Sequence, residues 1–172
     1  MTYQFDSLKP ELIKQRKAVH QVCRNYRNQP DSTNFKKLKS LFSACGQKVF
    51  IEPGFYCDYG DKITIGHNVF FNINATLLDG GKIAIGDDCL IGPNVQILTI
   101  NHATNPTERL KKENFADDVL IGNNVWIGAG AIILPGVTIA DGCVIAAGSV
   151  VTKSTEANSL YAGNPAKFKK YC

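Results

Sequence analysis

The sequence lacks the features that mark several common protein classes. No apolar run approaches the roughly 18 residues that a membrane-spanning helix needs. The N-terminal stretch has no apolar segment typical of a secretory signal, so we expect a cytoplasmic protein. None of the six cysteines lies in a C-x-x-C motif, and their irregular spacing disfavours zinc fingers and a compact disulfide framework. Reduced thiols are the better interpretation.

Net charge is also small. The 172 residues carry 19 Lys plus Arg against 15 Asp plus Glu, a formal charge of +4. Hydrophobic residues make up 44% of the chain, which is enough for one ordinary folded domain and excludes wholesale disorder. The mild positive charge suits an anionic cofactor or substrate. We therefore expect neither a nucleic acid nor a membrane as partner.

What the chain does have is a six-residue repeat from residue 65 onward. The second hexad position is mostly Gly or Ala, and Asn, Asp or Gly tends to follow; the fifth is mostly small or β-branched. Such residues form turns readily. The first position of each hexad is large and apolar at all twelve sites: Ile65, Phe71, Leu77, Ile85, Ile91, Ile97, Ile121, Ile127, Ile133, Ile139, Ile145 and Val151.

A period of six fits neither an α-helix nor a simple hairpin meander. A coil in which three hexads form one turn of a triangular prism fits both the repeat and the turns. Each short strand then pairs in parallel with the strand one turn away, about 4.8 Å along the axis. The large residues stack inside and the small fifth residues fill the corners. Cys89 and Cys143 fall at fifth positions, so we predict that both are small buried hydrophobes.

Residues 49–62, before the regular repeat, read as an imperfect first turn with Ile51 and Cys57 on the apolar ladder. The two ends of the sequence are candidates for covering this coil. Apolar spacing predicts helices over 11–27 and 34–45, the second capped by Asp31 or Ser32 and stopped at Gly46. The prediction is a cap segment at 1–46, the coil at 47–156 and a C-terminal tail at 157–172. The basic helix faces are also compatible with an RNA- or membrane-binding arm, but a solvent-exposed face is the simpler interpretation.

The repeat is interrupted once, by a polar loop at 103–118. Long insertions in compact domains are usually functional. His102 stands where the coil stops and this loop begins. That position makes His102 the first candidate for a catalytic residue.

Specific motifs run from about residue 5 to residue 170. The chain contains, in order, FDSLKPEL, FYCDYGDKITIG, NINATLLD, IGPNVQILTINHATNPTER, IGNNVWIGAGAIILPGVTI, VIAAGSVVTK and AGNPAK. With these motifs it resembles the hexapeptide-repeat acyltransferases, and in particular the maltose/galactoside O-acetyltransferase branch. The resemblance implies an all-β core built as a left-handed parallel β-helix, a homotrimer, and active sites between neighbouring prisms.

The resemblance also implies a reaction: transfer of an acetyl group from acetyl-CoA to a hydroxyl, with a sugar as acceptor and no metal. His102 is the implied general base, since an imidazole with a pKa of about 6.5 can accept the hydroxyl proton. Transfer is expected to be direct, because no cysteine matches a nucleophile position. The backbone N–H of Ala129 is the implied oxyanion donor.

Further site residues follow from the same resemblance. Asn72, Asp58 and Asp6 match positions on the acceptor side, where carboxylates suit a polyol because they accept hydrogen bonds. Gly80 departs from galactoside-type relatives, which often carry a second acidic residue there, so the acceptor preference stays open. The implied CoA contacts run along the coil and into the tail, where the lysines can meet phosphates: Ala129, Ala147, Thr152, Lys153, Lys167 and Lys170.

Other functions are weighed against this one. A γ-class carbonic anhydrase uses the same coil but needs three histidine ligands, and His20, His67 and His102 are not suitably spaced. A non-catalytic scaffold protein is disfavoured by the presence of His102, Asn72 and the 103–118 loop. The same chemistry on serine, an antibiotic hydroxyl or an amino-sugar nitrogen remains an alternative. Trp126 is expected to line either the CoA channel or a subunit contact.

Overall fold

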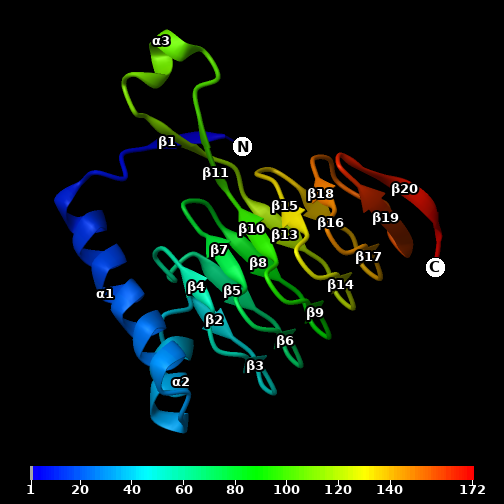
Figure 1. Ribbon diagram of the computed structural model, residues 1–172, viewed down its shortest axis with the longest axis horizontal. Helices are drawn as coiled ribbons and strands as arrows, with labels where there is room; N and C mark the ends of the chain where they lie inside the picture. Colours follow the sequence, from blue (N-terminus) through cyan, green and yellow to red (C-terminus); the bar gives the residue numbers. More distant parts are fainter. Residues whose placement is uncertain (1) are drawn as a thin grey trace.

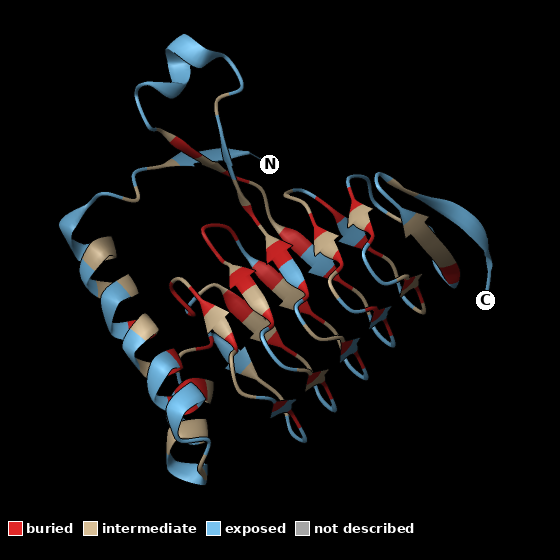
Figure 2. Ribbon diagram, viewed as in Figure 1, coloured by how far each residue is buried: buried red, intermediate tan, exposed pale blue. Residues whose placement is uncertain are grey.

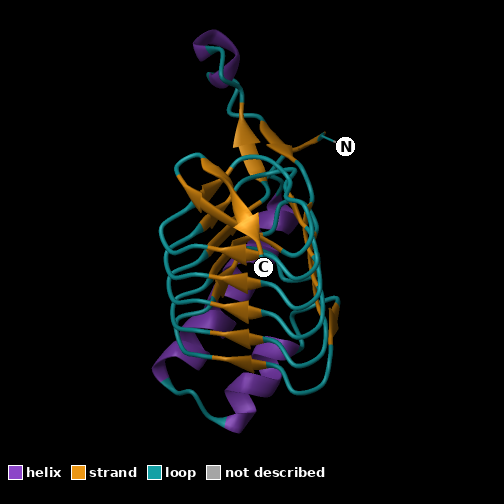
Figure 3. Ribbon diagram, turned by 90° about the vertical axis from the view of Figure 1, so that its right-hand side faces the viewer, coloured by secondary structure: helices purple, strands orange, loops and turns teal. Residues whose placement is uncertain are grey.

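The computed structural model describes residues 2–172 as a β-helix capped at one end by two helices (Figure 1). The coil has three walls of short strands, which stack as parallel rungs when viewed from the side (Figure 3). One wall is a five-stranded sheet of β4 (Tyr56–Cys57), β7 (Thr76–Leu78), β10 (Gln96–Leu98), β15 (Ile132–Ile133) and β18 (Val150–Val151).

The other two walls are built in the same way. The second contains β2 (Ala44–Cys45), β5 (Ile63–Ile65), β8 (Ile83–Ile85), β13 (Val119–Ile121) and β16 (Thr138–Ile139). The third contains β3 (Phe50–Ile51), β6 (Phe70–Phe71), β9 (Leu90–Ile91), β14 (Trp126–Ile127), β17 (Val144–Ile145), β19 (Ser159–Gly163) and β20 (Ala166–Tyr171).

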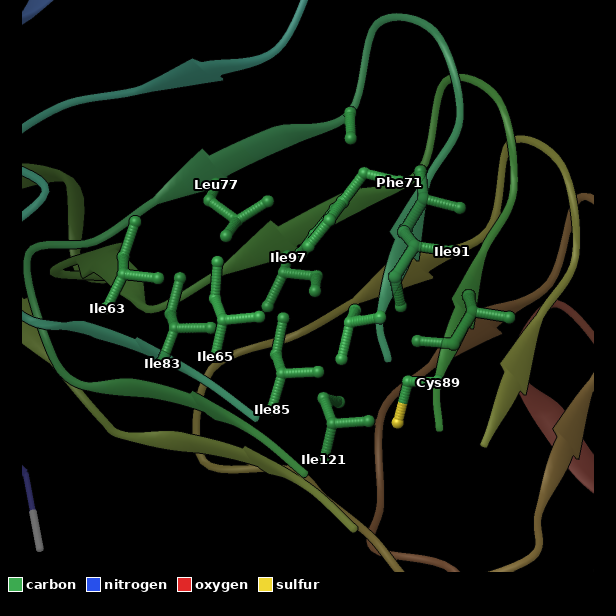
Figure 4. Packing of buried hydrophobic residues seen from close by; sticks show 14 of the residues in the cluster. Ile63, Ile65, Phe71, Leu77, Ile83, Ile85, Cys89, Ile91, Ile97 and Ile121 are labelled. Carbon is green, nitrogen blue, oxygen red and sulfur yellow. The ribbon is translucent and has the colours of Figure 1, made fainter. Parts of the chain in front are cut away.

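Strand register places the repeat's apolar residues on three internal ladders. In the third wall, for example, Ile51 pairs with Phe71, which pairs with Ile91. All twelve predicted leading residues are buried, as are Cys89 and Cys143, so the predicted packing is confirmed. Figure 2 shows buried residues along the strands of the coil, and Figure 4 shows Phe71, Ile91 and Ile97 packed together inside it. Burying one such side chain contributes about 1.5–3 kcal/mol, and the ladders therefore supply the main stabilisation of the coil.

The turns also follow from the repeat. Asn68, Asp88 and Asn124 adopt positive φ, which Asn and Asp tolerate better than most residues. At the same corner the side chain of Asp87 accepts the backbone N–H of His67 at 2.7 Å. Asn123 accepts the N–H of Asp87 in the same way at 2.9 Å. At this corner each turn therefore accepts a hydrogen bond from the backbone N–H of the preceding turn of the coil.

The helical cap differs in part from the prediction. Helix α1 (Pro10–Asn28) packs against β4, and α2 (Ser32–Lys39) begins after Asp31, whose side chain caps the Asn34 N–H as expected. The predicted extension of the second helix to residue 45 is wrong. Ala44–Cys45 instead forms β2, because pairing with β5 lets Cys45 continue an internal ladder next to Ile65.

Gly46, predicted as a helix stop, lies in the first coil turn. A Cβ at this position would lie 2.4 Å from the carbonyl oxygen of Gly66. The glycine is thus required by the close stacking of two turns and does not end a helix. The coil accordingly begins at Ala44, before the expected boundary at residue 47.

A projecting arm, residues 100–118, interrupts the coil where the repeat breaks. It contains β11 (Ile100–His102), α3 (Pro106–Arg109) and β12 (Asn114–Ala116), and it stands away from the prism (Figure 1). The N-terminal strand β1 (Tyr3–Phe5) pairs with β12, which pairs in turn with β11. Residues 3–5 are thereby joined to the arm, with β12 between them and the strand that ends at His102.

The C-terminal tail continues the third wall. Strand β19 pairs in parallel with β17, and β20 folds back on β19 as an antiparallel hairpin. The hairpin covers the end of the coil opposite the helices (Figure 1). Among residues 2–172, no helix combines the length and hydropathy that crossing a bilayer requires.

Candidate active site

A groove of 620 Å³ runs along the outer surface of the third wall. Strands β6, β9, β14, β17 and β19, together with the turns that follow them, form its floor. Three residues expected in the site, Asn72, Ala129 and Ala147, contribute to its lining. The full lining is Phe70, Asn72, Leu90, Ile91, Gly92, Pro93, Trp126, Gly128, Ala129, Val144, Ile145, Ala146, Ala147 and Leu160.

Glycines keep the backbone of this groove closely stacked. A Cβ at Gly92 would lie 2.8 Å from the nitrogen of Ala129, and one at Gly128 would lie 2.6 Å from the nitrogen of Ala147. Within residues 2–172, neither alanine N–H donates a backbone hydrogen bond. The groove thus has two backbone donors that a bound molecule can use.

Asn72 adds a side-chain donor to the same groove. Its Oδ1 accepts the backbone N–H of Ile73 at 2.8 Å, which fixes the side chain in a local turn. No hydrogen bond from the Asn72 Nδ2 occurs within the described residues. The amide can therefore donate to an oxygen of a ligand in the groove.

Large apolar side chains follow one another along the outer surface of the third wall. Phe50, Phe70, Leu90 and Trp126 occupy the same register position on successive strands. Phe50 is 63%, Leu90 52% and Trp126 55% exposed. The corresponding positions of the second wall are Ala44, Thr64, Ala84, Leu120 and Thr138, which are mostly smaller. We call the four large side chains the outer apolar ladder.

His102 lies at the end of β11, outside this groove. Its Nδ1 is 3.1 Å from the carbonyl oxygen of Glu113. A carbonyl only accepts, so Nδ1 carries the proton in this bond and Nε2 of the neutral ring is an open acceptor. A separate hollow of 450 Å³ next to the ring is lined by Ser7, Leu8, His102, Arg109, Lys112 and Asn114.

The groove and the His102 hollow share no residue. A single chain therefore does not bring His102 and Asn72 into one pocket. Four of the residues implied to contact CoA lie outside the groove lining and are exposed: Thr152, Lys153, Lys167 and Lys170.

Asp6 and His102 flank the same strand, β12, from opposite sides, and the hollow that Asp6 lines does not include His102. Asp6 follows β1, whose Phe5 pairs with Asn114, and Asn114 pairs with His102. The Asp6 Oδ1 accepts the N–H of Leu8 at 2.9 Å. The N-terminal segment thus reaches the arm by forming a strand beside it, a pairing that the sequence pattern did not reveal.

Asp58 lies at a corner of the coil, against α1. Its Oδ1 is 3.2 Å from the Nε2 of His20, and the Tyr56 hydroxyl is 2.6 Å from the same nitrogen. The His20 and Asp58 side chains are 20% and 14% exposed. Sequence reasoning missed this contact, because no local pattern links residue 20 to residue 58.

Asp79 holds the backbone of that corner. Its buried carboxylate accepts the N–H groups of Asp58, Tyr59 and Gly60 at 2.8, 3.0 and 2.6 Å. Burial raises the pKa of Asp79, and the three donors oppose that shift. The signal available in the sequence was an acidic residue placed where the repeat requires a turn, within NINATLLD.

Gly80 lies directly against the side chains of Ile100 and Phe5. A Cβ there would lie 2.6 Å from the Ile100 side chain and 2.7 Å from that of Phe5. A side chain at this position would therefore require the Ile100 and Phe5 side chains to shift. No group of three or more His, Cys, Asp and Glu side chains suited to a metal ion occurs in residues 2–172.

Known proteins resemble this chain in sequence and in fold. A model described as "Bacterial transferase hexapeptide (six repeats)" matches residues 118–153, and one described as "Hexapeptide repeat of succinyl-transferase" matches residues 62–98. A galactoside O-acetyltransferase of Lactococcus lactis is 40% identical over 134 residues, 77% of this chain and 65% of that protein.

Two solved structures share nearly the whole architecture. The maltose O-acetyltransferase of Clostridium difficile superposes with a TM-score of 0.94 and 37% identity, over 98% of this chain and 91% of that one. An acetyltransferase of Vibrio cholerae in complex with acetyl-CoA gives 0.92 and 33%, over 97% and 92%. By sequence, coil and length, the chain belongs to the hexapeptide-repeat acetyltransferase family, in its maltose and galactoside O-acetyltransferase branch.

Proposed function

We propose that this protein transfers an acetyl group from acetyl-CoA to a hydroxyl of a sugar-like acceptor, with His102 as the general base. The observation that carries the proposal is the bond from His102 Nδ1 to the Glu113 carbonyl, which leaves Nε2 as an acceptor. Relatives named as maltose and galactoside O-acetyltransferases support the acceptor class.

The chemistry needs one proton acceptor and one oxyanion donor. As the hydroxyl oxygen attacks the thioester carbon, its proton passes to His102 Nε2. The new C–O bond forms, the negative charge on the carbonyl oxygen is met by the Ala129 N–H, and the C–S bond then breaks. The proton returns from His102 to the leaving thiolate. Atoms and charge therefore balance without a covalent enzyme intermediate.

The groove provides a suitable surface for the donor. Small residues and unused N–H groups at Ala129 and Ala147 suit the extended pantetheine arm with its amides. The exposed lysines of the tail, Lys167 and Lys170, and Lys153 and Thr152 after β18 suit the phosphates. Asn72 Nδ2 and the carboxylates of Asp58 and Asp6 are the proposed acceptor contacts.

A homotrimer with sites between subunits completes this arrangement. In one chain His102 and the groove are separate, so a complete site needs the arm of a neighbouring copy. The outer apolar ladder, with Phe50, Leu90 and Trp126 exposed, gives the apolar surface that an association between copies buries. Light scattering is expected to give the mass of three chains, and a monomer with full activity would contradict the shared site.

The acceptor is tested by measuring thiol release from acetyl-CoA. Maltose, galactosides, glucosamine, chloramphenicol and serine form the panel, and the acetylated product of each is identified by mass spectrometry. We expect O-acetylation of a sugar well above the acceptor-free rate. Faster transfer to serine, the antibiotic or the glucosamine nitrogen would assign another acceptor, and no transfer to any compound would overturn the proposal.

Complementation tests whether the site is shared. His102→Ala and Asn72→Ala each disable one half of the proposed site. Mixed trimers of the two variants contain interfaces where both halves are intact, so co-expression is expected to restore part of the activity. The matched control is the double variant co-expressed with His102→Ala, which has no intact interface. Equal activity in the two mixtures would contradict sites between subunits.

A further inference from the structure

Within residues 2–172, His20 is the one histidine with a side-chain hydrogen bond to a proposed acceptor residue. It projects from α1 toward the coil, where its Nε2 is 3.2 Å from Asp58 Oδ1. The Tyr56 hydroxyl lies 2.6 Å from Nε2 and 3.0 Å from Nδ1, and the Tyr56 and His20 rings are 4.5 Å apart at their centroids. These three side chains form a hydrogen-bonded cluster between helix and coil.

The surrounding contacts hold the helix and the coil corner together. Arg16 donates to the Tyr59 hydroxyl at 3.2 Å, and Gln15 donates to the Tyr59 carbonyl at 3.3 Å. From the coil side, Asp79 fixes the backbone N–H groups of the same corner. The backbone of Asp58 is therefore fixed by Asp79, while its carboxylate is directed by His20.

The contact engages only one carboxylate oxygen. Oδ1 is paired with His20, and no hydrogen bond to the Asp58 Oδ2 occurs within residues 2–172. A carboxylate with one oxygen anchored and the other open accepts a hydroxyl in a defined direction. The side chain remains partly accessible, at 14% exposure.

We propose that His20 is a positioning residue for the acceptor: its imidazole anchors Asp58 Oδ1, so that Oδ2 is aimed at a hydroxyl of the bound polyol. With Nε2–H donating to Asp58, the Tyr56 hydroxyl donates to Nδ1 at 3.0 Å and holds the imidazole in place. The N-terminal helix thus takes part in acceptor recognition in addition to capping the coil. This inference rests on the proposed function, because it takes Asp58 as an acceptor contact.

The test separates acceptor binding from folding and from chemistry. His20→Ala is expected to raise the acceptor KM about tenfold, the cost of one lost charge-assisted hydrogen bond. The KM for acetyl-CoA, the kcat and the melting temperature are expected to stay close to wild type. His20→Gln keeps an amide donor and is expected to recover part of the loss. His67→Gln, at an exposed turn histidine, is the matched control.

A double-variant cycle gives the decisive result. If His20 acts through Asp58, His20→Ala adds little to the acceptor KM of Asp58→Asn. An unchanged acceptor KM in His20→Ala, or effects of the two changes that multiply, would overturn the inference. Should His20→Ala fold poorly, Tyr56→Phe and His20→Gln give the same readout with smaller changes in packing.

The outcome also distinguishes this inference from the proposed function. If wild type acetylates a sugar, His102→Ala does not, and His20→Ala has a normal acceptor KM, only the role of His20 is wrong. If wild type acetylates no acceptor hydroxyl, the proposed function fails and the role of His20 fails with it.

Discussion

The coil and the projecting arm differ in how deeply their residues are buried and in which segments they contact. In the coil every third hexad returns to the same wall, and large side chains such as Ile97 are completely buried. In the arm most residues are exposed, including Leu110 at 79%, and the strands pair with the distant N-terminus. The coil therefore carries the stability, while the arm carries the one imidazole proposed to do the chemistry. Changes in the two regions should separate stability from activity.

The largest expected effect is on activity and comes from the arm. His102→Ala removes the proposed base and is expected to lower kcat roughly 10²- to 10⁴-fold. The melting temperature should not change, because the ring is exposed and contacts a single backbone carbonyl. Thiol release and thermal unfolding measure the two quantities. Near-normal transfer by a folded variant would show that His102 is not the base.

A substitution in the coil is expected to lower stability. Ile97→Ala removes a fully buried ladder residue and is expected to cost about 2–5 kcal/mol of unfolding free energy. Leu110→Ala in the arm is the matched control and is expected to change stability by less than about 0.5 kcal/mol. Urea unfolding measures both. Equal losses would mean that the arm also belongs to the folded core.

A smaller effect is expected at the coil corner that the Asp79 carboxylate holds. In Asp79→Asn an amide nitrogen replaces one of the oxygens that accept backbone N–H groups, at a cost of about 1–3 kcal/mol. Asp61→Asn, at an exposed neighbour, is the control. If both variants unfold at the same urea concentration, the corner does not depend on the Asp79 carboxylate.

Asp79 also predicts how the stability of the protein depends on pH. Burial raises the pKa of Asp79, so folding favours the protonated carboxyl. The pH-dependent part of its contribution to stability is complete below about pH 3.9 and is lost as pH rises through the folded-state pKa. The advantage of wild type over Asp79→Asn is therefore expected to decrease with rising pH. An advantage that grows with pH would contradict the raised pKa.

The smallest expected effect is a difference in the reactivity of two cysteines, measured without changing the fold. Cys172 is exposed at the C-terminus, whereas Cys89 is buried in the coil and its pKa is raised to about 11. At pH 8 an alkylating reagent should modify Cys172 first, and Cys89 only after unfolding. Peptide mapping by mass spectrometry follows each site, with Cys172→Ser as control. Rapid modification of native Cys89 would contradict a closed coil.

Most of the coil could be predicted from the sequence because its contacts repeat locally. Residues such as Ile85 and Ile121 face inward for the same reason at every turn, so six-residue spacing specifies their environment. The second helix was predicted too long because Leu41 and Phe42 continue the apolar helix face of Phe35 and Leu38, although a strand begins at Ala44. Pairing with β5 decided between the two, and that contact is not encoded in local spacing.

The candidate site was only partly predictable. Resemblance pointed to His102, Asn72, Ala129 and Asp58, but two observations depend on the folded chain. One is that His102 and the groove are separate within one chain. The other is that Asp58 contacts His20.

The sequence by itself determined the three-walled coil, since a strict repeat of large, small and turn-forming residues leaves one efficient way to bury its apolar side chains. Only the tertiary structure decided which distant segments meet at the edges of that coil. Strand β1 lies beside the arm, and His20 reaches Asp58, because backbone pairing and side-chain packing act between residues that are far apart in sequence. Those non-local contacts shape the proposed acceptor side of the site.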